Sequence, residues 1–360
     1  MRALLDLESD DHYHLYASTR LGRLGPRIDE TIRRHSRAVV SERLFPARLL
    51  KLLAAIPGVG VETLLGEVDV FHHTDLMYLP VKRSPQVVTV HDLAFEVDRG
   101  FHGRGFAESA RRRLKSVLSR AAAVVVPSRA TRSDLITRYG VPAEQVVVIP
   151  HGVDHVARHV SSRSAAAENV IPESPFALFI GTVEPRKNLV RLLKAFAIAA
   201  GKDAELSLLI AGRRGWETGP FLRELRQHRW RARIGWREDA ADEELVALCC
   251  ASRFLVYPSL YEGFGLPVGE AMWLGTPVIT SSRSSLPEIA GDAALLVDPE
   301  DVEDLAGAML KLNGDEGLRR RLSELGRAQS SQFTWRRSAE MTAAVYRRVA
   351  ARERVSNPLS

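Results

Sequence analysis

Cysteine is nearly absent from this chain of 360 residues, and its two cysteines, Cys249 and Cys250, are adjacent. Adjacent cysteines match neither a disulfide framework nor a metal-ligand spacing, so we expect both to be packing residues. No apolar run approaches the roughly 20 residues that cross a membrane. The first residues lack the apolar stretch and cleavage site of a secretory signal. We therefore expect no transmembrane helix and a cytoplasmic protein.

Acidic residues are scarce in one stretch of a chain whose formal net charge is +6. Between residues 99 and 120, only Glu108 opposes seven basic residues: Arg99, Arg104, Arg111, Arg112, Arg113, Lys115 and Arg120. A solvated helix face, attraction to an anionic membrane surface or phosphorylated acceptor, and nucleic-acid binding are the three interpretations. Since no aromatic-interleaved RNA platform is present, we expect no nucleic-acid partner.

Short β-branched runs alternate with longer amphipathic stretches, which is typical of βα units around parallel sheets. The length allows two domains. In the first half we expect strands at His14–Ala17, Ala38–Val40, Val68–Phe71, Gln86–Val90, Ala123–Val126 and Val146–Ile149. In the second half we expect strands at Phe176–Ile180, Leu206–Ile210, Phe254–Tyr257, Val278–Thr280 and Ala294–Val297. The predicted fold class is α/β, with two doubly wound parallel-sheet (Rossmann-like) domains.

Composition sets the expected domain boundaries. Serine, alanine and proline replace the apolar alternation after the sixth strand, which indicates a linker. We therefore predict a first domain over 1–154, a linker over 155–175, a second domain over 176–331 and a C-terminal helix over 332–360. That helix is Arg-rich and has one narrow apolar stripe, which should dock on a partner surface. The stripe consists of Met341, Val345 and Val349.

The most specific segment spans residues 257–272. A buried strand is followed by a loop that contains Gly263 and Gly265. A helix then begins at a proline, a residue suited to the first helical turn. The start of that helix offers backbone N–H groups to a diphosphate, and the glycines allow close approach. Glu262 in the loop and Glu270 in the first helical turn are placed to accept hydrogen bonds from sugar hydroxyls. A plain glycine turn is the alternative.

Two glutamates separated by seven residues in this strand–loop–helix setting resemble the signature of glycosyltransferase family 4. Five further blocks in the same order extend the resemblance over most of the chain: 86–93, 125–128, 148–154, 181–188 and 284–288. The resemblance implies a GT-B fold, in which two domains face a cleft. The first domain would then lie on the acceptor side, the second would bind the nucleotide sugar, and the C-terminal helix would cross back to the first.

The resemblance also implies roles for individual residues. Glu270 would bind the ribose hydroxyls, and Glu262 would touch the donor sugar. Arg186 and Lys187 would reach the diphosphate, where cations stabilise charge that develops on the leaving phosphate. His91 would face the donor sugar across the cleft. We therefore predict Glu262, His91, Lys187 and Arg186 as the catalytic residues.

Further donor-binding residues are expected in the loops that follow strands. With Glu270 they are Gly181, Thr182, Gly212, Trp236, Gly263, Phe264, Gly265 and Leu266. Several family members carry an arginine directly after the strand glycine, where this chain has Thr182. Neutralisation of the phosphates would then depend on Arg186 and Lys187 alone. The roles of His151 and Asp154 near the hinge, and the identity of the nucleotide base, stay open.

The resemblance implies a retaining hexosyl transfer from a GDP- or UDP-linked sugar to a glycan or lipid-linked acceptor. Blocks 90–93 and 184–188 resemble the mannosyltransferase-like branch of surface polysaccharide assembly, which favours GDP-mannose. We expect no cofactor and no metal, since no Asp-x-Asp motif occurs. We also expect a cytoplasmic protein that is peripheral on the inner face of the membrane. The alternatives are an epimerase or phosphorylase of the same fold, or a nonenzymatic membrane-associated partner subunit.

The beginning of the chain departs from the family pattern. Residues 3–7 have the character of a helix end that leads into the first expected strand. Family members normally start earlier, with a strand, a glycine-rich loop and the first half of that helix. We therefore expect that the natural beginning is missing and that the first sheet has a gap or a rearrangement.

Overall fold

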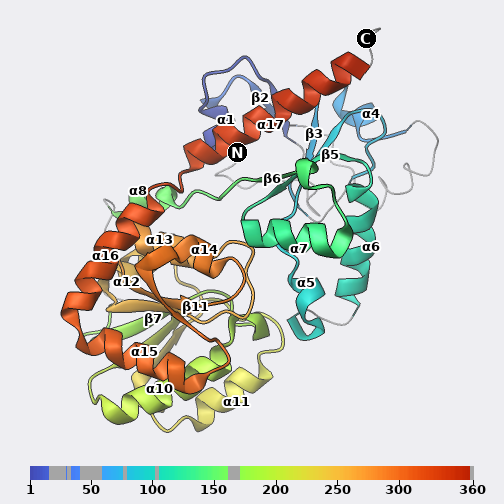
Figure 1. Ribbon diagram of the computed structural model, residues 1–360. Coiled ribbons are helices and arrows are strands. Elements are labelled where there is room, and N and C mark those ends of the chain that lie inside the picture. Colours follow the sequence, from blue (N-terminus) through green and yellow to red (C-terminus); the bar gives the residue numbers. More distant parts are fainter. Residues whose placement is uncertain are drawn as a thin grey trace.

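A computed structural model describes residues 1–15, 30, 34–40, 59–75, 79–101, 105–160 and 171–356. Figure 1 shows two α/β domains beside each other, with a long C-terminal helix running from the second domain to the first. Every strand pairing in both domains is parallel. No helix in the described part of the chain is long and apolar enough to cross a bilayer.

The first domain contains six described strands in two separate sheets. They are β1 (Tyr13–Leu15), β2 (Ala38–Val40), β3 (Phe71–His73), β4 (Gln86–Thr89), β5 (Ala121–Val126) and β6 (Val146–Val148). β1 pairs only with β2, while the other sheet has the order β3-β4-β5-β6. Its helices are α1 (Arg2–Leu5), α4 (Glu62–Leu65), α5 (Ala94–Val97), α6 (Phe106–Leu118) and α7 (Arg129–Tyr139). The expected gap or rearrangement of the first sheet and the expected earlier start both stay predictions, because residues 16–29, 31–33 and 41–58 lie outside the described part of the chain.

The second domain is built on one six-stranded sheet of order β12-β11-β10-β7-β8-β9. Its strands are β7 (Phe176–Ile180), β8 (Ser207–Ala211), β9 (Ile234–Arg237), β10 (Phe254–Tyr257), β11 (Val278–Ser281) and β12 (Ala294–Val297). Its helices are α10 (Leu189–Lys202), α11 (Gly219–Gln227), α12 (Asp242–Ala251), α13 (Leu266–Leu274), α14 (Leu286–Ala290), α15 (Val302–Gly314) and α16 (Glu316–Ser330). The central strands β7 and β10 are apolar and almost wholly buried, because helices cover both faces of the sheet.

Two strand predictions need correction. β9 was not expected, because this short edge strand contains a glycine and an arginine and is mostly half-buried, so it lacks a continuous apolar run. β3 begins at Phe71, where we expected a strand to end. The alternation of Val68 and Val70 suggested a strand, but these residues lie in the loop that leads into β3. The first expected strand ends at Leu15 within the described residues, and its last two positions, 16 and 17, lie outside them.

The C-terminal helix α17 (Trp335–Ser356) packs on the first domain (Figure 1). Val345 and Val349 are buried against Val87 of β4 and Val125 of β5. A second set of contacts joins Ala339 and Ala343 to α1. The apolar stripe seen in the sequence is therefore covered by this chain's own first domain.

The segment between the domains begins with helical structure, the 3₁₀ turn η3 (Asp154–Val156) followed by α8 (Ala157–Val160). Apart from Asp154, these residues belong to the expected linker. Residues 161–170, which carry most of its serines and alanines, lie outside the described part of the chain.

Candidate active site

The candidate site lies at the carboxyl ends of β7 and β10. These strands are neighbours and parallel, so the loops that follow them meet at one edge of the sheet. β7 leads into the 3₁₀ turn η4 (Pro185–Lys187), and β10 leads through the loop 258–265 into α13. Ligands of open parallel sheets bind at such an edge.

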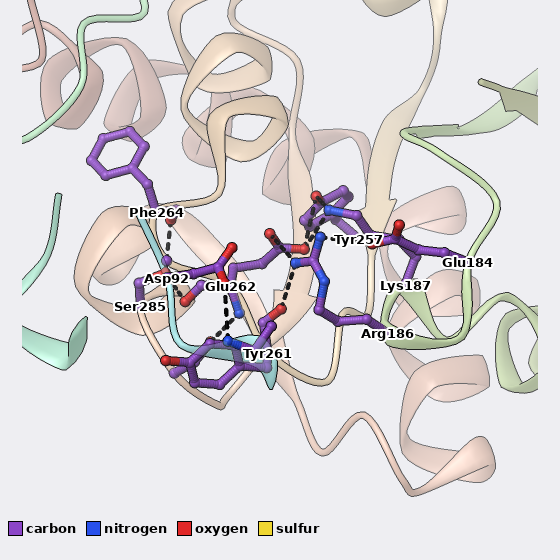
Figure 2. Close-up of polar contacts among 12 residues, drawn as sticks. Asp92, Glu184, Arg186, Lys187, Tyr257, Tyr261, Glu262, Phe264 and Ser285 are labelled. Carbon is purple, nitrogen blue, oxygen red and sulfur yellow. Dashed lines mark hydrogen bonds and ion pairs between the residues drawn. The ribbon is translucent and has the colours of Figure 1, made fainter. Parts of the chain in front are cut away.

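Glu262 is buried between the two cations predicted from the sequence. Its Oε2 lies 2.7 Å from the Arg186 guanidinium, and its Oε1 lies 2.5 Å from Lys187 Nζ. Figure 2 shows the glutamate side chain reaching from its loop toward both. Arg186 and Lys187 were open to interpretation as a solvated pair, but both side chains are largely withdrawn from water. The structure thus joins three of the four predicted catalytic side chains directly.

Two further side chains complete this cluster. The Tyr257 hydroxyl donates to Glu262 Oε1 at 3.0 Å and accepts from Lys187. Burial raises the pKa of Tyr257 to about 12, so the phenol stays a neutral donor. Glu184 pairs with Arg186 at 2.7 Å on the side away from Glu262. Together these residues form a buried network of two carboxylates, two cations and a phenol, which we call the charge cluster (Figure 2).

The charges on Glu262 and Lys187 are held by their partners within the charge cluster, whereas burial raises the pKa of Glu184. Burial opposes the charge on Glu262, but Lys187 and Arg186 outweigh it and lower the pKa of this carboxyl. Burial likewise opposes the charge on Lys187, and Glu262 raises the pKa of the ammonium. Loss of one partner would leave a buried charge uncompensated, which costs about 3 to 5 kcal/mol.

The glycine loop is fixed from both domains. Ser285 Oγ donates to the carbonyl oxygens of Glu262 and Phe264, at 3.0 and 2.9 Å. From the first domain, Thr131 Oγ1 donates to the carbonyl of Gly263 at 3.2 Å. A Cβ at Gly263 would lie 1.8 Å from the carbonyl oxygen of His91, so only glycine allows this approach between domains. Gly265, at φ 101°, starts α13 in a conformation that favours glycine.

His91 lies just after the end of β4 and contacts the second domain. Its backbone carbonyl contacts Gly263, while its exposed ring donates from Nε2 to the carbonyl of Thr74 at 2.9 Å. The rings of His91 and His151 have centroids 5.6 Å apart, and Phe264 packs edge-on against His151 at 5.2 Å. Burial lowers the pKa of His151 to about 4, so its ring is neutral near pH 7.

Glu270 does not lie in the first turn of its helix, contrary to our expectation. α13 begins at Leu266, one residue before the proline, so Glu270 is in the second turn. Its Oε1 lies 3.2 Å from His155 Nε2. The two glutamates of the sequence motif therefore have different partners, a pair of cations for one and a histidine for the other.

The remaining predicted donor-binding residues surround the ends of β7, β8 and β9. Gly181 and Gly212 approach so closely that a Cβ on Gly212 would meet the Gly181 carbonyl oxygen at 1.9 Å. The Trp236 indole donates to the carbonyl of Gly212 at 3.0 Å. Thr182 follows Gly181 and is partly buried. Leu266 is instead the first residue of α13, after β10, and is also partly buried. Their roles toward a nucleotide stay predictions.

Comparison with known proteins agrees with this geometry. The profile described as Glycosyltransferase Family 4 matches residues 7–156, and that of Glycosyl transferases group 1 matches residues 161–329. The O-antigen chain mannosyltransferase B of Escherichia coli is 31% identical over 78% of this chain and 74% of its own length. The chain belongs to glycosyltransferase family 4.

Other relatives of this family 4 glycosyltransferase support the assignment. The MMP alpha-(1->4)-mannosyltransferase of Mycolicibacterium hassiacum is 32% identical over 80% of this chain and 72% of its own length. Among solved structures, Anabaena HepE in complex with UDP has a TM-score of 0.70 at 18% identity and covers 92% of this chain and 98% of its own. Sucrose-phosphate synthase from Thermosynechococcus elongatus has a TM-score of 0.69 at 21% identity, and the match covers 93% of this chain and 82% of the synthase chain. These structures show that the fold is GT-B.

Sequence reasoning missed several residues of the glycosyltransferase site. Glu184 lies inside the block 181–188, yet only its pairing with Arg186 in the structure reveals a role. Tyr257 has the pattern of a core strand residue, and no local signal shows that its hydroxyl meets Lys187. We also overlooked the four-residue spacing of His151, His155 and His159, a pattern that can hold a metal. Within the described ranges, no cluster of three or more His, Cys, Asp or Glu side chains is arranged for a metal ion.

Proposed function

We propose that this glycosyltransferase transfers mannose from GDP-mannose to a glycan or lipid-linked acceptor in polysaccharide assembly, with retention of the anomeric configuration. The charge cluster carries this proposal. Its two cations and its carboxylate lie at the carboxyl ends of parallel strands, the edge at which open parallel sheets bind ligands, and they suit a nucleoside diphosphate sugar. The two relatives described above, both mannosyltransferases, support the choice of sugar.

The chemistry follows from the charges. The donor diphosphate takes Arg186 and Lys187 as partners, and these cations stabilise the negative charge that develops on the leaving phosphate. Glu262, partly released by this exchange, stabilises positive charge at the sugar ring together with His91. The leaving phosphate accepts the proton of the acceptor hydroxyl, since no side-chain nucleophile is assigned. Glu270 binds the ribose.

A donor screen tests this function. Purified protein is incubated with GDP-mannose, UDP-glucose and UDP-N-acetylglucosamine and with mannose-terminated oligosaccharide acceptors, and the product is examined by NMR. We expect transfer from GDP-mannose and an α-linked product. A β-linked product would contradict retention. Hydrolysis or epimerisation of the donor without transfer would instead support the epimerase alternative, and binding without any turnover the nonenzymatic one.

Activity is expected to survive metal chelation. Arg186 and Lys187 supply the two positive charges that a divalent cation would otherwise bring to the diphosphate. Turnover in excess EDTA should therefore stay within about twofold of turnover in Mg²⁺. If a bound metal supplied a preorganised charge, its removal would instead lower the rate about 10²-fold. Initial rates in EDTA, Mg²⁺ and Mn²⁺ check this, and a strict need for either metal would contradict it.

The basic segment 99–120 is proposed to attract an anionic membrane surface. Arg111 is the exception, because it pairs with Glu96 at 2.8 Å and Glu108 at 3.0 Å. Glu96 lies before the segment and was not counted among its acidic residues. Arg112, Lys115 and Arg120 are exposed, while Arg104 lies outside the described residues.

Binding to anionic vesicles is expected to be weak and to fall with salt. Each basic residue near such a surface contributes about 1 kcal/mol, so Arg112→Ala with Lys115→Ala should weaken binding about tenfold or more. Vesicle sedimentation with and without phosphatidylserine measures this. Arg320→Ala with Arg321→Ala, an equal charge change on exposed positions of α16, is the control. Equal binding to neutral vesicles would remove the electrostatic argument.

A further inference from the structure

The two segments that connect the domains are packed directly on each other. A Cβ at Gly152 would lie 2.2 Å from the backbone nitrogen of Trp335, so the first segment has no room for a side chain there. The Val153 N–H donates to the carbonyl of Phe333 at 2.9 Å, and the Trp335 N–H donates to Asp154 Oδ1 at 2.8 Å. The start of α17 is thereby fixed to the end of the first domain.

His155 extends this connection to the donor site. The Trp335 indole lies 3.1 Å from His155 Nδ1, and His155 Nε2 lies 3.2 Å from Glu270 Oε1. An indole N–H can only donate, so Nδ1 must accept. In the neutral ring the proton is then on Nε2, and it points at the carboxylate. One tautomer satisfies both partners.

Protonation of the second ring nitrogen of His155 is favoured by some neighbouring groups and opposed by others. The hydrogen bond to Glu270 is the main cause that raises the pKa of His155 above its ordinary value; burial and Arg158 act against it, and Asp154 acts with it. A proton on Nδ1 would, however, set two N–H donors against each other at the Trp335 contact. The indole therefore favours the neutral ring with its proton on Nε2.

We propose that His155 is a positioning residue, oriented by Trp335 at the domain connection, that holds the Glu270 carboxylate for the ribose of the donor nucleotide. The inference rests on the proposed function, which assigns the ribose to Glu270. A carboxylate with one oxygen occupied by His155 keeps its other oxygen for a ribose hydroxyl and is restricted to fewer rotamers. Preorganisation of this kind reduces the entropy lost on binding.

The test measures the dissociation constants of GDP and UDP by calorimetry, together with donor KM and kcat. His155→Ala is expected to weaken binding of the preferred nucleotide about tenfold, the effect of losing one hydrogen bond to a charged group. KM for the donor should rise in parallel, with kcat within about twofold. His155→Gln, which keeps a side-chain donor, should restore affinity to within about threefold of wild type.

A double-mutant cycle separates positioning from general damage. In the Glu270→Ala background, His155→Ala should weaken binding by less than about twofold, because it acts only through that carboxylate. Equal losses in both backgrounds would overturn the positioning role alone. Trp335→Phe keeps an aromatic ring but removes the indole N–H. Unchanged nucleotide affinity in this variant would overturn the role of Trp335 in orienting His155. If wild-type protein bound neither GDP nor UDP, the proposed function would fall as well.

Discussion

Lys187→Ala is expected to lower turnover at least about 10²-fold, the scale for loss of one preorganised charge partner. Lys187 Nζ contacts both Glu262 and the Tyr257 hydroxyl in a buried position. Without it, Glu262 keeps only Arg186, and one of the two cations that we propose for the diphosphate is lost. Glu262→Ala should have an effect of the same size, because it removes the carboxylate that we propose to face the sugar. Steady-state rates with saturating donor measure both losses.

Matched controls exist for both substitutions. Lys194→Ala lies on the exposed face of α10, and Glu303→Ala on the exposed first turn of α15, so each removes the same charge away from the site. Both controls should keep turnover within about twofold, as is usual for surface substitutions. Retention of full transfer activity by folded Glu262→Ala or Lys187→Ala protein would show that the site assignment is wrong.

Gly263→Ala is expected to reduce kcat/KM by about 10²-fold, the loss that accompanies a misplacement of about 1 Å. The added methyl would meet the His91 carbonyl oxygen at 1.8 Å and the Asp92 Cβ at 2.9 Å. Both contacts belong to the other domain. Because the three atoms nearest to the added methyl all belong to the first domain, we expect nucleotide affinity to change little while the approach between the domains is disturbed. Calorimetry with GDP and initial rates separate the two quantities.

Gly307→Ala provides the comparison for Gly263→Ala, because Gly307 lies inside α15 with no atom near its missing Cβ. This substitution should leave turnover unchanged and raise stability by about 0.5 to 1 kcal/mol, since alanine is the better helix former. If Gly263→Ala weakened nucleotide binding as strongly as it lowered turnover, the clash would act within the second domain rather than between domains.

Local signals predicted much of the fold. A serine and a glycine predict the two ends of α7, and both cap it, because Ser128 Oγ accepts from the Thr131 N–H and Gly140 takes a left-handed conformation. Strands β7 and β10 match their predicted bounds, since buried apolar runs have clear limits. The edge strand β12 also matches, although it is mostly half-buried or exposed, because all four of its residues are apolar. The edge strand β9 was missed because its glycine and arginine interrupt the apolar pattern.

The site was predictable only in part. Spacing after strands, with the family resemblance, predicted Glu262, Arg186 and Lys187 as residues of one site. The partners depend on distances across the sheet, which no local pattern encodes. Tyr257 needed the paired strands β7 and β10 to bring its hydroxyl to Lys187, whereas Glu184 lies only two residues from Arg186 and needed the local turn. Likewise, the place of Glu270 depends on a helix that starts one residue earlier than its proline indicates.

The docking of α17 has a consequence for synthesis of the chain. Val345 and Val349 complete a core whose other members, including Val87 and Val125, are made much earlier. Roughly 200 residues separate β6 from these valines, and at about 5 to 20 residues per second the ribosome needs roughly 10 to 40 seconds to make them. During that time the face of β4 and β5 that α17 later covers is open to solvent. The first domain to emerge is therefore completed last, and its uncovered valines form a transient surface for chaperones or for aggregation.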